Sequence, residues 1–183
     1  MKTTTMNVRV WIAVAGLLTS QLATAQESLN LSAFRGNYKG GVTQAGPGAG
    51  NTASGRASVS FKVPQNGTSA RVRYTAAISD GMGGTNILPT SMVLTSNQRV
   101  SVTDLLVGIA GTNNAKPGTG DWIQRKRSLK IDATNGEGIT LRGTAAVKDL
   151  RSKRKLTLTL VSSDGVDTTT FTTQLRARLP RRN

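Results

Sequence analysis

Polar and apolar residues alternate with a period of two along almost all of the chain after residue 26. In RASVSFKV, residues 56–63, every second side chain is apolar, and ARVRYTAAI, residues 70–78, continues the pattern. Successive side chains of a β-strand point to opposite faces, so this period predicts strands with one buried face. A helix would need a period near 3.6, and no segment shows one. The sequence therefore predicts an all-β fold.

Residues 56–78 form the clearest predicted hairpin. A two-residue type I′ turn at Asn66 and Gly67 would join its strands, because both central positions of that turn need positive φ. A slip of one residue would mix the two faces, so the register is well specified. The expected cross-strand pairs are Phe61 with Val72, Val59 with Tyr74, and Lys62 with Arg71, with Arg73 on the same cationic face.

A second hairpin is expected over residues 152–178, folded about a tight turn at Asp164 and Gly165. Leucines and Phe171 would share its inner face, and basic residues its outer face. Like charges directly across a ladder are unfavourable, so such a face suggests an anionic partner. The expected pairs are Lys153 with Arg176 and Arg151 with Arg178, with Lys155 on the same face and Arg181 and Arg182 extending it.

The remaining strands complete an antiparallel meander of about 8–10 strands. A meander of that length curls into a barrel or half-barrel, and the sequence leaves its closure open. Glycines on the inner face of the first strand favour curvature or close backbone approach. A membrane barrel would alternate too, but only 4% of the residues are aromatic, too few for interfacial girdles. The further strands are expected at residues 34–43, 92–95, 99–109, 122–133 and 139–148.

The first 25 residues predict a cleaved secretory signal peptide. Lys2 and Arg9 precede an apolar run over residues 10–18, and Ala23 and Ala25 flank a cleavage site. Residues 26–183 then form a single domain, exported to the periplasm or secreted, with no transmembrane segment in the mature chain. The absence of cysteine means that this domain uses no disulfides.

Charge is the strongest signal in the composition. Without Lys2 and Arg9, the mature chain keeps 22 Lys and Arg against nine Asp and Glu, a net charge of +13. Histidine is absent, so this charge hardly changes between pH 5 and 8. A balance of this kind favours association with polyanions or anionic membrane surfaces, and solubility alone is the alternative.

Several kinds of chemistry are excluded by composition. Without histidine or cysteine, the chain has no Ser-His-Asp or Cys-His triad and no zinc site built from those residues. Its acids are scattered, and Asp132, Asp149 and Asp164 are expected to be turn residues. The sequence thus predicts a non-enzymatic protein without cofactor or metal.

Two arginines raise a more specific hypothesis. If residues 122–133 form one strand, Arg125 and Arg127 share the inner face with Leu129, opposite the small residues Gly143 and Ala145. Buried arginine needs an anionic partner or a wet cavity, so these four residues would line an anion-binding recess. The alternative is a β-bulge near Arg127 that turns both arginines outward.

Two functions follow, and the oligomeric state stays open. In the first, the cationic outer face binds an anionic envelope component, a polyanion or lipid head groups. In the second, a small amphiphile or lipid occupies the barrel interior with its head group on the inward arginines. Sequence-specific nucleic-acid binding is not expected, because few aromatic residues are present to stack on bases. The polyanion-binding candidates are Lys62, Arg71, Arg73, Arg151, Lys153, Lys155, Arg176 and Arg178.

Overall fold

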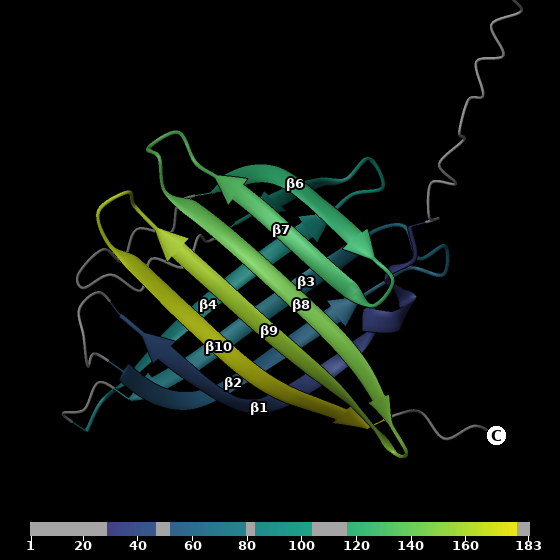
Figure 1. Ribbon diagram of the computed structural model, residues 1–183, viewed down its shortest axis with the longest axis horizontal. Coiled ribbons are helices and arrows are strands. Elements are labelled where there is room, and N and C mark those ends of the chain that lie inside the picture. Colours follow the sequence, from purple (N-terminus) through teal and green to yellow (C-terminus); the bar gives the residue numbers. More distant parts are fainter. Residues whose placement is uncertain (1–28, 47–51, 80–82, 104–116, 179–183) are drawn as a thin grey trace, which may run out of the picture.

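Ten antiparallel strands close into a barrel in which the first strand pairs with both the second and the last (Figure 1). A computed structural model of the protein describes residues 29–46, 52–79, 83–103 and 117–178. The predicted all-β meander is confirmed, and the sheet is a closed barrel. The signal peptide predicted for residues 1–25 lies outside the described residues. The elements are the 3-10 helix η1 (Leu31–Phe34) and the strands β1 (Gly36–Ala45), β2 (Thr52–Lys62), β3 (Ala70–Ser79), β4 (Thr85–Leu94), β5 (Arg99–Val102), β6 (Gly118–Arg125), β7 (Ser128–Thr134), β8 (Thr140–Leu150), β9 (Lys153–Ser163) and β10 (Thr168–Arg178).

The alternation places apolar side chains inside the barrel and polar ones outside. The register of β2 with β3 is the predicted one, with Phe61 opposite Val72 and Lys62 opposite Arg71. The predicted turn is wrong. The amide of Gly67 donates to the carbonyl of Pro64, and Gly67 has positive φ while Asn66 does not. The strands end before this longer loop, so their register does not depend on a two-residue turn.

The hairpin of β9 and β10 is shifted by two residues from the expected register. Its loop spans Asp164 to Asp167, because the Asp164 carboxylate accepts hydrogen bonds from the amides of Val166 and Asp167. Lys155 therefore lies opposite Arg176, and the predicted pairing of Lys153 with Arg176 is wrong. An even shift keeps every side chain on its face, so the predicted inner and outer faces are confirmed.

A tight turn divides the segment that was expected to be one strand over residues 122–133. Lys126 adopts positive φ, at 51°, and the chain reverses between β6 and β7. Trp122 then pairs with Ile131, and Gln124 with Leu129. The reversal places Trp122 and Leu129 on the inner face and moves Arg125 to the outer one.

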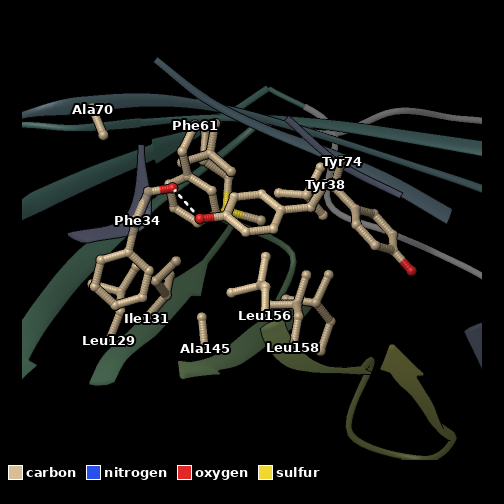
Figure 2. Packing of buried hydrophobic residues seen from close by; sticks show 14 of the residues in the cluster. Phe34, Tyr38, Phe61, Ala70, Tyr74, Leu129, Ile131, Ala145, Leu156 and Leu158 are labelled. Atoms are coloured by element: carbon tan, nitrogen blue, oxygen red, sulfur yellow. Dashed lines mark hydrogen bonds between the residues drawn. The ribbon is translucent and has the colours of Figure 1, made fainter. Parts of the chain in front are cut away.

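Aromatic and aliphatic side chains from opposite walls meet in the barrel interior (Figure 2). Phe61 contacts Phe34, with 5.6 Å between ring centroids, and Tyr38, edge-to-face at 6.4 Å. Leu129 and Leu156 point toward them from the other wall. Burial of the Tyr38 hydroxyl raises its pKa, and the hydroxyl donates to the Phe34 carbonyl at 2.9 Å. The described interior is therefore lined by a continuous cluster of buried side chains.

One end of the barrel is closed by η1. Leu31 and Phe34 are fully buried, and the Leu31 amide donates to the Gly67 carbonyl. The Asn30 amide donates to the Gln124 side chain, which donates in turn to the Asn30 carbonyl. None of the helical structure in the described segments is long and apolar enough to cross a bilayer.

Candidate anion-binding surface

Four basic residues on four neighbouring strands lie directly opposite one another on the outside of the barrel. Lys148 of β8 pairs with Lys155 of β9, Lys155 with Arg176 of β10, and Arg176 with Lys39 of β1. We call these four residues the cationic row. In Figure 1, β8, β9 and β10 run side by side with β1 next to β10. Directly opposed side chains have Cβ atoms about 5 Å apart, so each cation has another cation as its cross-strand neighbour.

No ion pair among the described residues involves the cationic row. Ion pairs elsewhere on the barrel join Arg99 to Asp121, Arg142 to Asp132, and Asp149 to two other arginines. Each like-charge contact across a ladder costs about 0.2–1 kcal/mol. An anion lying along the row would replace these three repulsive contacts by attractive ones.

A second group of cations continues the surface around the barrel. Lys62 of β2 lies opposite Arg71 of β3, as predicted, and Arg73 lies opposite Ser60. Arg56 of β2 is exposed as well, and it lies opposite Gly41 of β1. Exposed or half-exposed cations thus occupy the outer face of six consecutive strands, β8, β9, β10, β1, β2 and β3.

The structure divides the other predicted cations between strand and turn. Lys153 lies at the start of β9, opposite both Leu150 and Arg178. Arg151 lies in the turn between β8 and β9, so its predicted pairing with Arg178 is wrong. Arg181 and Arg182 lie outside the described residues.

Three cations of this surface were missed by sequence reasoning: Lys39, Arg56 and Lys148. Each alternates with buried neighbours, so the period of two already places it outside. Their position beside the predicted cations depends on which strands are neighbours. The pairing of β1 with β10 joins segments more than 120 residues apart, and no local pattern specifies it.

The predicted recess around Arg125 and Arg127 is absent from the inner face. Arg125 is exposed on the outer face of β6, and Arg127 lies in the β6–β7 turn. The alternative, that both arginines turn outward, gives the correct outcome, although a reversal at Lys126 replaces the expected bulge. Gly143 and Ala145 are buried opposite Ile131 and Leu129. Leu160 Cδ2 occupies the space beside Gly143, at 3.1 Å from the position of an added Cβ.

Arg127 has a structural partner that the sequence did not reveal. Its guanidinium lies 3.0 Å from Asp149 Oδ2, and Arg154 Nε lies 2.6 Å from Asp149 Oδ1. Arg154 and, to a smaller extent, Arg127 lower the pKa of Asp149 by hydrogen bonding to its carboxylate. Asp149 and Asp132 were expected in turns, but both lie in strands, opposite Arg154 and Arg142. Arg127 therefore shares one carboxylate with Arg154, and the three side chains together keep one positive charge.

The described residues of β1, β2, β3 and β4 also form two grooves near the surface cations. One, of about 760 Å³, lies near the end closed by η1 and is lined by Arg35, Lys62 and Arg71 together with apolar groups of Val63 and Val93. The other, of about 700 Å³, lies beside the cationic row, and its lining includes Lys39, Arg56 and Thr75.

Comparisons with known proteins are limited to the fold. No protein-family model matches the chain, and no curated protein matches its sequence. Two solved structures are similar over most of their length. A redesigned β-barrel is 15% identical, with a TM-score of 0.38, and the match covers 84% of this chain and 98% of that one. The S-type phycobiliprotein lyase CPES from Guillardia theta is 9% identical, with a TM-score of 0.47, over 83% of this chain and 92% of that one.

Proposed function

We propose that this protein is an exported, non-enzymatic β-barrel that binds a polyanion through its cationic outer face. The observation that carries the proposal is the cationic row, with four like charges opposite one another and none of them in an ion pair with a described acid. In water, screening keeps the repulsion within the row small enough for the barrel to tolerate it. Binding of a polyanion releases its counterions and adds direct charge pairs.

Two parts of the proposal, export and the lack of catalysis, rest on the sequence alone. The basic, apolar and small-residue order of the first 25 residues supports a secretory signal, and bacterial envelopes and their surroundings are rich in anionic polymers. The chain has no histidine or cysteine to act as a general base or nucleophile at neutral pH. Both parts of the proposal can be tested separately from binding.

Retention of the mature domain on immobilised heparin and on lipopolysaccharide, measured across a salt series, tests the proposal. The key variant carries Lys39→Gln, Lys148→Gln, Lys155→Gln and Arg176→Gln. The slope of log affinity against log salt should fall by about 3 in this variant, since each charge contacting a flexible polyanion contributes about 0.7. The matched control removes the same number of charges from exposed positions of β5, β6, β7 and β8, with the substitutions Arg99→Gln, Arg125→Gln, Lys130→Gln and Arg142→Gln. Equal slopes for the two variants would overturn the proposal.

Amphiphile binding is a second candidate function, supported by the groove near the closed end. The barrel interior expected to hold such a ligand contains the buried side chains of Trp122, Tyr38 and Tyr74, and the inward arginines expected there are outside. The outer groove combines apolar walls with the cations Arg35, Lys62 and Arg71. Native mass spectrometry of the purified domain should show a carried anionic amphiphile that is lost in a Val93→Asp variant, and an unmodified mass in both proteins would contradict this candidate.

A further inference from the structure

The second outer groove lies where the cationic row meets strand β2. Its walls come from three strands, and its volume is about 700 Å³. It is hollow because the outer positions on both sides of Arg56 carry almost no side chain: Arg56 lies opposite Gly41 on β1 and opposite Ala77 on β3. The groove is lined by Lys39, Gly41, Arg56, Ser58, Thr75 and Ala77.

The polar groups around this groove can all donate hydrogen bonds. Lys39 carries an ammonium group, Arg56 a guanidinium group with five N–H donors, and Ser58 and Thr75 carry hydroxyls. Lys39 lies directly opposite Ser58, and Ser58 opposite Thr75, so these donors form one line across β1, β2 and β3. Arg56 lies one outer position away along β2, within reach of the same ligand. No carboxylate is part of the lining.

This arrangement fits a tetrahedral oxyanion better than a carboxylate. A carboxylate has two oxygens in one plane, which one arginine can satisfy by a bidentate contact. A sulfate monoester or a phosphate monoester has three terminal oxygens pointing in three directions. The donors on β1, β2 and β3 lie in one line, and Arg56 lies one outer position away from that line, so together they offer several donors to the three oxygens of one group.

The curvature of the cationic surface favours a flexible polymer over a flat membrane as the molecule that carries the ester group. The cations extend over six of the ten consecutive strands of a closed barrel, which is more than half of its circumference. A flat membrane touches only one side of a convex surface of this kind. A flexible polymer can follow the surface, with one ester group in the groove and others along the cationic row.

We propose that the groove over Gly41 binds a sulfate or phosphate ester group of a linear polyanion, such as an acidic polysaccharide. This inference rests on the proposed polyanion-binding function and names the chemical group that is recognised. Lys39 belongs to both the row and the groove, and it links the two parts of the binding surface.

The variant Gly41→Leu tests the proposal, because it fills the groove and leaves every cation in place. A Cβ at Gly41 would meet no atom closer than the Gly55 carbonyl oxygen at 3.9 Å, and Gly41 is not among the glycines with positive φ. The same barrel should therefore form, as thermal unfolding can verify. Thr43→Leu is the matched control, since Thr43 is exposed on the same strand two residues further on and does not line the groove. Arg56→Gln is a second variant that removes the guanidinium charge and three of its five N–H donors without adding volume.

Dextran sulfate and carboxymethyl dextran of equal charge density are the probes, with vesicles containing 30% phosphatidylglycerol as the membrane arm. Gly41→Leu and Arg56→Gln should each weaken dextran sulfate binding by about tenfold, as expected for one lost charge-assisted contact. For Gly41→Leu, which keeps every cation, binding of carboxymethyl dextran should change less than twofold. Arg56→Gln also removes a surface charge, so it should weaken carboxymethyl dextran binding, but by less than it weakens dextran sulfate binding. Thr43→Leu should match the wild type on both polymers.

Three results would overturn the inference in distinguishable ways. Unchanged dextran sulfate binding by Gly41→Leu and Arg56→Gln would exclude the groove and leave the polyanion function standing. Equal losses on both polymers would show that the groove takes any anion. Wild-type protein that binds the vesicles as tightly as dextran sulfate would identify a membrane as the partner. If the wild type binds neither polymer in a salt-dependent way, the proposed function itself fails.

Discussion

Two rows of charged side chains cross the outer face of this barrel, and they differ in how their charges are arranged. In the first, which we call the balanced row, Arg99, Asp121, Asp132 and Arg142 lie opposite one another on β5, β6, β7 and β8. Each arginine at an end of this row forms an ion pair with the adjacent aspartate, at 2.7 Å for Arg99 and Asp121 and at 3.5 Å for Arg142 and Asp132. The cationic row begins on the next stretch of sheet, at Lys148 of β8, and holds four positive charges.

The difference shows that fold stability does not explain the cationic row. Both rows occupy exposed positions of the same kind on neighbouring strands. Exposed ion pairs such as those of the balanced row stabilise a protein by at most about 1 kcal/mol, and the like charges of the cationic row oppose folding by a similar amount. The anion binding proposed above would offset this cost.

The largest effect is expected from disrupting the pairing of β1 with β10, which places Lys39 next to the rest of the cationic row. In Gly40→Ala, the added methyl group would overlap the Gln174 carbonyl oxygen of β10. The β1–β10 pairing that sets Lys39 beside Arg176 must then shift. We expect a loss of about 3 kcal/mol in the free energy of unfolding, measured by chemical denaturation, together with weaker heparin retention. Gly41→Ala is the adjacent control, because its methyl group points into open space. A Gly40→Ala variant as stable as the control would contradict the close approach of β1 and β10 at Gly40.

A smaller loss is expected from Asp149→Asn, which removes a partly buried charge pair instead of an exposed one. The Arg154 side chain is only 19% exposed, and Asp149 binds both Arg154 and Arg127. We expect a loss of about 1–2 kcal/mol at pH 7, compared with less than about 1 kcal/mol for Asp121→Asn in the balanced row.

The pH dependence of stability should report the same contact. The folded-state pKa of Asp149 is lowered, mainly by the hydrogen bond from Arg154. This carboxylate therefore stabilises the fold above its unfolded pKa of about 4, and that contribution is lost as the pH falls through the lower folded pKa. Chemical denaturation between pH 7 and pH 2 should show a weaker acid dependence in Asp149→Asn than in the wild type. Parallel curves for the two proteins would show that the ion pair does not form in solution.

The smallest change in stability, with the opposite sign, is expected when an acid is introduced into the cationic row. In Arg176→Glu, the new carboxylate lies between Lys155 and Lys39 and can pair with both. The free energy of unfolding should rise by about 0.5–1 kcal/mol, while heparin retention falls. Dextran sulfate should raise the melting temperature of the wild type more than that of this variant. A variant that is less stable than the wild type would show that the row does not repel itself.

Much of the fold could be predicted from alternation, because the period of two reports locally which face of a strand is buried. The β2–β3 register and both faces of the β9–β10 hairpin are confirmed. The errors concern turns. A carboxylate that accepts two amides at Asp164, or a positive φ at Lys126, changes loop length or direction without altering the pattern of the strands. The error at Lys126 produced the predicted arginine recess, because one unrecognised reversal moves Arg125 to the other face.

From the sequence alone, the chain was predicted to form an all-β meander with apolar side chains on one face and an excess of cations on the other. Only the tertiary structure decided that the sheet closes, that β1 lies against β10, and that Lys39, Arg176, Lys155 and Lys148 stand in one row. The reason is the range of the interactions. Side-chain orientation follows from the geometry of one strand, whereas the neighbours of a strand follow from closure of the whole sheet around a shared core.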